Sequence, residues 1–196
     1  RGVVVAGATL EADAVVLALG PWTSHVAGAL LPLVHGLKGY SVTLAAGDVP
    51  AHALFVDYRT GEGQALEPEI FPREKGEVYV CGMADPAPLP DSPDGVTVNP
   101  AMCDVLTRAA GRVSTAQAAA VVTKRQACYR PVTDDGLPLI GPVPGARGAF
   151  VATGHGPWGM LDAPATGYAL AELIATGTPS LDLAAFDPRR LRPARV

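Results

Sequence analysis

Apolar residues occur in short runs along the chain, and each run is flanked by glycine, proline or charge. The first two runs cover residues 2–6 and 14–18 and are rich in valine and alanine. Runs of this length and composition predict β-strands, joined here by a turn over residues 7–13. The second run has no alternating polar positions, which is typical of a parallel strand buried on both faces. A helix is expected next, over about residues 23–31.

The pattern changes after residue 36, where short strand-like runs alternate with glycine-containing turns. These runs predict an antiparallel meander and cover residues 40–44, 53–56 and 78–81. A proline-rich loop is expected over residues 85–99. It leads to a predicted helix over about residues 100–112, with Asn99 as its N-cap.

Strand-like sequence returns near the C-terminus. Residues 148–153 predict a buried strand, which runs into a glycine-rich segment over 154–159 and then a helix over 164–176. Pro164 is expected in the first turn of that helix, where a missing N–H costs nothing, and Gly177 at its end. Strands at both ends bracket the antiparallel middle. The pattern therefore predicts an α/β (α+β) protein, with a nucleotide-binding layer that carries an inserted antiparallel domain.

Composition narrows the classes of function. Hydrophobic residues make up 48% of the 196 residues and charged residues 17%, which supplies a sizeable core and excludes wholesale disorder. The net charge is −4 and the sequence has no run of lysine or arginine, which argues against nucleic acid or an anionic membrane as partner. The apolar runs are too short to cross a bilayer, so no membrane span is expected.

The cysteines indicate the cellular compartment, and the first residue indicates where the natural N-terminus lies. Cys81, Cys103 and Cys128 show neither CxxC nor zinc spacing, so no metal site is expected. Their odd number argues against a disulfide framework and fits a reducing compartment, which predicts a cytoplasmic protein. The chain opens at Arg1 within a predicted strand and without an initiator Met. We therefore expect the natural N-terminus to lie upstream.

Four segments carry the candidate chemistry: residues 12–22 (ADAVVLALGPW), 37–41 (LKGYS), 129–141 (YRPVTDDGLPLIG) and 152–167 (ATGHGPWGMLDAPATG). Their order and spacing resemble the C-terminal half of the D-amino-acid oxidase superfamily of FAD-dependent oxidoreductases, which includes glycine oxidase, sarcosine oxidase and D-amino-acid dehydrogenases. The resemblance covers roughly residues 12–188, although the stretch 45–120 does not contribute to it.

The resemblance implies a division of the chain into domains. Part of an FAD-binding Rossmann-like layer is expected over residues 1–35, and its returning strand and helix over residues 146–180. A mostly antiparallel substrate domain is expected between them, over residues 36–145, and a tail over residues 181–196. The family's N-terminal βαβ unit with GxGxxG, which binds the ADP half of FAD, does not occur in this sequence.

Gly154, Gly156 and Gly159 have the GxGxxG spacing but a different position in the chain. After a strand and before a helix, this spacing is that of a dinucleotide fingerprint, but no acidic residue ends a following strand about 20 residues later. The resemblance assigns the loop to the flavin ring instead. There, helix N–H groups would stabilise negative charge on the reduced ring, and glycines would allow close approach. A tight turn with structural glycines is the alternative.

The cofactor site that the resemblance implies contains small, aromatic and loop residues. It comprises Ala18, Gly20, Trp22, Gly154, His155, Gly156, Trp158, Gly159 and Met160. Several of these have structural alternatives. His155 either contacts flavin or substrate or makes a packing or capping contact, and the two tryptophans either border the ring or belong to the core. The strand end at Ala18 and Gly20 either abuts the FAD pyrophosphate side or provides ordinary β–α packing.

Arg130 is the predicted substrate residue. In the resembling enzymes, an arginine in an R-P-x-T-x-D-G-x-P motif pairs with the substrate carboxylate, and a planar guanidinium can fix such a group with two parallel hydrogen bonds. The alternative is a salt bridge to Asp134 or Asp135. Residues 134–138 predict a turn rather than a catalytic dyad of Asp134 and Asp135, because Asp135-Gly136 is a hairpin signal.

Two further residues of the substrate domain have open assignments. Tyr40 in the KGYS segment either supplies a hydroxyl over the substrate or is a strand aromatic with a satisfied hydroxyl. Sarcosine oxidases tether flavin through a cysteine near the position of Cys128, while a lone cysteine beside a strand is usually an inert small hydrophobe.

The sequence therefore predicts an enzyme that oxidises the C–N bond of an amino acid or N-substituted amino acid by hydride transfer to FAD. The catalytic residues expected are Arg130, Tyr40 and His155. The partners expected are a small-molecule amine or amino acid and an electron acceptor, either oxygen or another acceptor. The alternative function is a non-catalytic or incomplete flavoprotein-like fragment that lacks the dinucleotide-binding unit.

Overall fold

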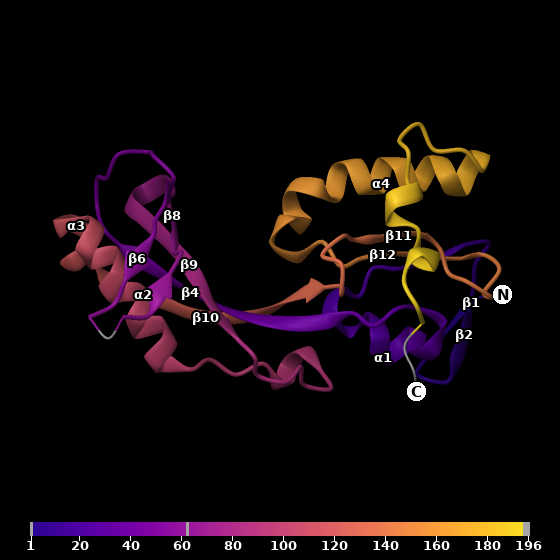
Figure 1. The fold of residues 1–196 in the computed structure, drawn as a ribbon, viewed down its shortest axis with the longest axis horizontal. Helices are drawn as coiled ribbons and strands as arrows, with labels where there is room; N and C mark the ends of the chain where they lie inside the picture. Colours follow the sequence, from indigo (N-terminus) through magenta and orange to yellow (C-terminus); the bar gives the residue numbers. More distant parts are fainter. Residues whose placement is uncertain (1, 62, 194–196) are drawn as a thin grey trace. The chain divides into compact units, whose positions relative to one another are not determined.

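The computed structural model describes residues 2–61 and 63–193, whose helices and strands are drawn in Figure 1. The chain divides into two compact units. Residues 1–36 and 130–196 form the flanking unit, and residues 37–129 form the inserted unit. The chain thus returns to the flanking unit at Arg130, whereas the sequence prediction placed the return at residue 146; the functional domain bounds stay a prediction.

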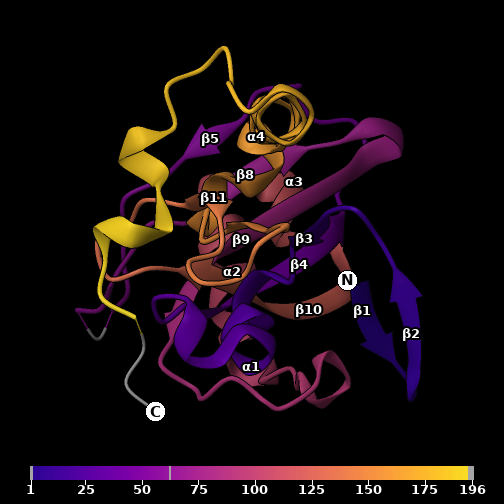
Figure 2. The same cartoon turned by 90° about the vertical axis from the view of Figure 1, so that its right-hand side faces the viewer.

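A three-stranded sheet lies at the centre of the flanking unit, in the order β11 (Leu139–Pro142), β12 (Ala149–Thr153) and β3 (Val15–Leu17). Strand β12 is parallel to β3 and antiparallel to β11. Figures 1 and 2 show α4 (Gly159–Thr176) on one side of these strands and α1 (Thr23–Ala27) on the other. The buried core includes Ala27, Leu31, Leu139 and Val151. This layering confirms the predicted mixed α/β class.

The N-terminal part of the flanking unit differs from the prediction at the expected turn. Residues 7–13 contain a strand, because β1 (Gly2–Val5) pairs antiparallel with β2 (Ala8–Glu11) in a hairpin. Ala6 and Gly7, with φ of 49° and 82°, form its two-residue turn. Positive φ at both central positions is the geometry that such short hairpins require, and the Ala-Gly pair is a weak signal for it.

Strand β3 is parallel, as predicted, but it is not buried on both faces. Val16 at its centre is 43% exposed. The strand lies at the edge of a three-stranded sheet, so the described residues cover it only in part. The helix predicted over 23–31 also ends early. α1 stops at Ala27, and Gly28 with φ of 51° leads into a 3-10 turn, η2 (Gly28–Leu30).

Helix α4 begins earlier than the prediction of a start at residue 164. A 3-10 turn, η5 (Gly156–Trp158), leads directly into α4 at Gly159. Pro164 therefore lies inside the helix rather than in its first turn, which corrects the assignment based on proline preference alone. Gly177 ends the helix in the left-handed conformation with φ of 77°, as predicted.

A tail with two 3-10 turns, η6 (Ala184–Phe186) and η7 (Pro188–Arg190), follows α4 in the flanking unit. Pro188 is buried, and its Cδ lies 3.5 Å from the position that a Cβ of Gly141 would occupy. The tail therefore contacts the sheet at β11. A further 3-10 turn, η1 (Gly20–Trp22), connects β3 to α1.

The inserted unit contains a five-stranded sheet in the order β10-β4-β9-β8-β5. Its strands are β4 (His35–Ala45), β5 (Leu54–Phe55), β8 (Glu69–Pro72), β9 (Glu77–Asp85) and β10 (Val121–Val132). The antiparallel pairing predicted for this region is confirmed for β4 with β9, β9 with β8 and β8 with β5. The order is not a meander, because β4 pairs with β9 rather than with the next strand in the sequence.

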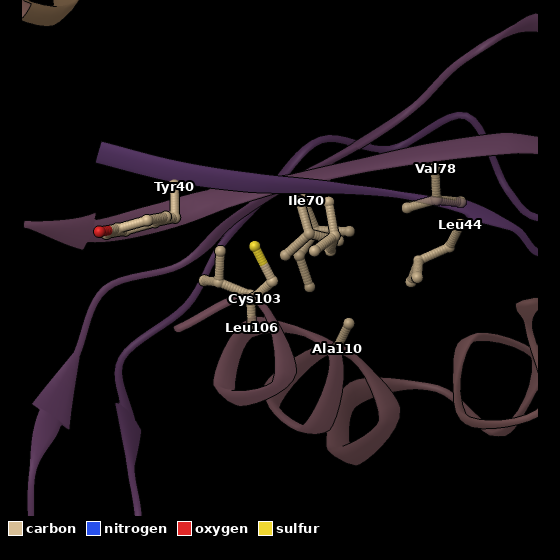
Figure 3. Close-up of a cluster of buried hydrophobic side chains, with 9 residues drawn as sticks. Tyr40, Leu44, Ile70, Val78, Cys103, Leu106 and Ala110 are labelled. Carbon is tan, nitrogen blue, oxygen red and sulfur yellow. The ribbon is translucent and has the colours of Figure 1, made fainter. Parts of the chain in front are cut away.

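Two helices and a small hairpin complete the inserted unit. The hairpin is β6 (Tyr58–Arg59) with β7 (Ala65–Leu66), the helices are α2 (Pro100–Val113) and α3 (Thr115–Ala118), and the 3-10 turns are η3 (Glu74–Gly76) and η4 (Pro93–Gly95). The predicted cap is confirmed, since the Asn99 side chain accepts a hydrogen bond from the Ala101 N–H at 3.1 Å. Figure 3 shows Cys103, Leu106 and Ala110 of α2 beneath the sheet residues, in the core of this unit.

Candidate functional site

Two strand ends of the flanking unit are joined by buried threonines. The Thr23 and Thr153 hydroxyls both donate to the Gly20 carbonyl oxygen, at 2.7 and 2.9 Å, and their oxygens lie 3.2 Å apart. Both side chains are buried. Because β3 and β12 are parallel neighbours, these bonds bring the end of β3 beside the start of the loop over residues 154–159. A crevice beyond the carboxyl ends of such strands is where α/β sheets bind ligands.

The three loop glycines have different surroundings. A Cβ on Gly154 would lie 2.9 Å from the Thr133 side chain, so packing against the turn after β10 requires glycine there. A Cβ on Gly156 would meet no atom within 4 Å, although its φ of 57° still favours glycine. A Cβ on Gly159 would make only ordinary contact with His155. The open face of the loop is therefore at Gly156. A Cβ on Gly20, whose φ is 54°, would likewise meet no atom within 4 Å.

The N-terminal end of α4 presents backbone donors. Its N-cap residue, Trp158, makes no side-chain capping bond. The first N–H groups of a helix have no partner inside the helix, and an 18-residue helix has a positive dipole end at this place. Met160 in the first turn is 94% exposed, and Trp158 is 57% exposed, so the core alternative for Trp158 is wrong. Trp22 is half-buried.

His155 ties this loop to α4. Its Nε2 lies 3.0 Å from the Thr166 Oγ1, a hydrogen bond within the flanking unit. Desolvation lowers the pKa of His155, and the negative charge of Asp162 opposes this shift only in part. A neutral, half-buried imidazole with a hydroxyl partner corresponds to the packing alternative. The direct contact of His155 with flavin or substrate stays a prediction.

Both carboxylates beside Arg130 have other partners. Asp134 lies 2.8 Å from the His35 Nε2, and Asp135 forms a two-pronged pair with Arg190 at 2.7 and 2.9 Å. Among the described residues Arg130 has no ion-pair partner, and its side chain is half-buried. The alternative of a salt bridge to Asp134 or Asp135 is therefore wrong, and the guanidinium of Arg130 is available to a ligand.

The segment after Arg130 is a turn, as predicted. The Gly136 N–H donates to the Thr133 carbonyl at 3.1 Å, and the Leu137 N–H donates to the Asp135 carboxylate at 3.1 Å. The Thr133 hydroxyl donates to the Leu137 carbonyl at 2.6 Å. The hydrogen bonds from Arg190 are the main reason that the pKa of Asp135 falls to about 2. Asp135 thus stays ionised and holds the turn.

Tyr40 lies in a closed polar network of the inserted unit. Its side chain is buried, and its hydroxyl donates to Asp85 Oδ2 at 2.6 Å. Burial, assisted by this hydrogen bond, raises the pKa of Tyr40 to about 12. The Lys38 Nζ lies 5.4 Å from the Tyr40 ring centre and 5.6 Å from that of Tyr129, whose hydroxyl donates to the Pro88 carbonyl. This geometry corresponds to the strand-aromatic alternative.

Sequence reasoning missed Lys38 and Asp85 as members of this network. The strand period offered one signal, because residues two apart on β4 point to the same face. The position of Asp85 relative to Tyr40 depends on a β-bulge, since the register of β4 and β9 shifts between Gly39 and Tyr40. Met83, with φ of 58°, is the extra residue on β9. No local sequence pattern predicts that bulge.

Cys81 and Cys103 are buried, and Cys128 is exposed. The tether through Cys128 stays a prediction. Over the described ranges, no three His, Cys, Asp or Glu side chains gather closely enough to hold a metal ion. No helix in those ranges has the length and hydropathy that crossing a bilayer needs.

Comparison with known proteins identifies the class. The chain matches the DAO family, described as FAD dependent oxidoreductase, over residues 1–173, and it belongs to that family. Glycine oxidase of Geobacillus kaustophilus is 32% identical over 187 residues, which cover 94% of this chain and 46% of that protein. D-amino acid dehydrogenase 2 of Ralstonia nicotianae is 33% identical over 190 residues, which cover 95% and 44%.

The solved structures agree with the family. The crystal structure of glycine oxidase from Geobacillus kaustophilus matches 95% of this chain and 48% of that protein, with a TM-score of 0.76 and 29% identity. The chain thus spans less than half the length of these relatives. Membership confirms the predicted family, its fold class and its cofactor, FAD.

Proposed function

We propose that the protein carrying this chain oxidises the C–N bond of an amino acid or N-substituted amino acid. The observation that carries the proposal is Arg130, a half-buried guanidinium without an ion-pair partner among the described residues. The names of two relatives, glycine oxidase and D-amino acid dehydrogenase, support an amino-acid substrate.

The residues present fit the flavin part of FAD. Gly20 and Gly156 leave open space where a side chain would stand, and the N-terminal end of α4 has no side-chain cap. Backbone donors and a positive helix end suit the electron-rich edge of a flat ring that gains negative charge on reduction. When bound, FAD supplies the acceptor for the hydride that leaves the substrate carbon.

The chain's own residues bind and orient the substrate in this proposal. Arg130 would hold the carboxylate through two parallel hydrogen bonds, which fixes the position of the α-carbon. Loss of the α-hydrogen as hydride, with loss of the amine proton, converts the C–N bond to an imine, and water hydrolyses the imine after release. Tyr40, whose hydroxyl stays protonated, would contribute packing rather than proton transfer. Oxygen or another electron acceptor would be the second substrate.

Arg130→Gln in the complete protein tests the proposal. The loss of charged hydrogen bonds to a carboxylate costs about 3 kcal/mol, which corresponds to a KM raised about a hundredfold for glycine or D-alanine. Arg147→Gln is the matched control, because Arg147 is an exposed arginine of the same unit. If Arg130→Gln keeps the KM of the unmodified protein, Arg130 does not bind the carboxylate and the proposal fails.

A further inference from the structure

Arg190 in the C-terminal tail contacts the turn after Arg130. Its Nε and Nη2 donate to the two carboxylate oxygens of Asp135 at 2.7 and 2.9 Å, and Nη2 also donates to the Leu137 carbonyl at 2.6 Å. The side chain is only 15% exposed. A planar guanidinium with two parallel bonds to a carboxylate fixes orientation as well as charge. Arg190 therefore fixes a segment that lies 53 to 55 residues away in the sequence.

Its neighbour in the sequence, Arg189, makes a different contact. The Arg189 side chain is 73% exposed, and its guanidinium donates to Asp187, two residues earlier in the same tail. Two adjacent arginines thus hold carboxylates in one unit, but only Arg190 reaches outside the tail. Exposed pairs such as that of Arg189 contribute little to stability.

The turn that Arg190 holds lies between the two segments of the candidate site. Arg130 precedes Thr133 by three residues at the end of β10. On the other side, the Thr133 methyl lies 2.9 Å from the position of a Cβ on Gly154, where the loop toward α4 begins. The Thr133 hydroxyl also contacts Asp135 at 3.1 Å. A continuous set of contacts therefore leads from Arg190 through Asp135 and Thr133 to Gly154.

We propose that Arg190 is a positioning residue for the oxidation, because it holds the turn that directly follows Arg130 in the chain and packs against Gly154. This inference rests on the proposed function. The geometry explains why arginine is needed, since a lysine ammonium would keep the charge but lose the two-pronged grip on Asp135. If Arg190 only held the tail in place, an ion pair with Asp135 would be sufficient.

The test compares four forms of the FAD-loaded protein: unmodified, Arg190→Lys, Arg190→Gln and, as matched control, Arg189→Gln. For each form we would measure KM and kcat for glycine and D-alanine, the reduction potential of the bound flavin and the melting temperature. We expect Arg190→Gln to raise KM about tenfold and to shift the potential. Arg190→Lys should recover the melting temperature but not KM, and Arg189→Gln should leave KM and potential unchanged.

Two results would overturn the inference. If Arg190→Gln lowers the melting temperature while KM and potential match those of Arg189→Gln, Arg190 only fastens the tail. If Arg190→Gln does not fold, Arg190→Lys decides alone, and a KM equal to that of the unmodified protein overturns the inference. Failure of the proposed function is distinguishable, because it appears as an unchanged KM in Arg130→Gln. An effect of Arg130→Gln without one of Arg190→Gln contradicts only the positioning role.

Discussion

The two units place polar groups in opposite ways. In the inserted unit, Tyr40 and Asp85 satisfy each other, and Lys38 lies between aromatic rings. In the flanking unit, the Arg130 guanidinium has no ion-pair partner among the described residues, and the N-terminal end of α4 has no side-chain cap. Buried polar groups are costly unless they are paired, so groups left open are those that a ligand can satisfy. We therefore expect a ligand to contact the open groups of the flanking unit.

Among the variants that test this difference between the units, we expect the largest effect on stability from one in the network of Tyr40 and Asp85. Tyr40→Phe removes the donor to Asp85 and leaves its carboxylate with one partner fewer. We expect a loss of about 1–2 kcal/mol in the free energy of unfolding, measured by urea denaturation, with KM unchanged. Tyr129→Phe is the control, because its hydroxyl donates to the Pro88 carbonyl rather than to a carboxylate. A raised KM at unchanged stability would mean that Tyr40 serves the substrate.

We expect a smaller effect on stability when a fall in pH protonates Asp135. Its pKa is lowered to about 2, chiefly by Arg190, so the stability it contributes is complete above the unfolded value near 4 and is lost as the pH falls through about 2. The carboxylate is 30% exposed, which reduces this contribution to about 1 kcal/mol. Asp135→Asn should therefore be less stable than the unmodified protein at pH 6, with a difference that shrinks between pH 4 and pH 2. A constant difference across that window would contradict the assignment.

Local signals predicted the parts of the fold that short segments determine. Asn99 caps α2 and Gly177 ends α4 because each residue satisfies the helix end within a few positions. The apolar run over 148–153 became β12 for the same reason. The order of the inserted sheet could not be read this way, since β4 pairs with β9 across a long segment of chain.

The sequence predicted the motifs of the candidate site but not the contacts that their residues make. The RPVTDDG segment indicated both Arg130 and the turn, because the turn residues are local. No sequence pattern pairs Asp135 with Arg190, which lies 55 residues away, or Asp134 with His35. These long-range pairs decided between the alternatives for Arg130. Tertiary packing also set the start of α4, which the preference of Pro164 for a first turn placed too late.

We propose that the flavin lies against the open face at Gly156 and the N-terminal end of α4. Gly156→Ala and Gly177→Ala test it most directly as a matched pair, because both glycines have positive φ, 57° and 77°, and neither has an atom within 4 Å of the added methyl. Gly156 lies in η5, directly before α4, and Gly177 follows the last residue of α4. The strain costs about 1 kcal/mol at each, so both variants should melt at similarly lower temperatures.

The decisive measurement is the reduction potential of bound FAD in this pair. We expect Gly156→Ala alone to lower it, since a methyl between the ring and the helix weakens the stabilisation of the reduced, negatively charged flavin. Gly177→Ala should keep the potential of the unmodified protein. Equal potentials in the two variants, at equal loss of melting temperature, would show that Gly156 is only a turn residue and does not face the flavin.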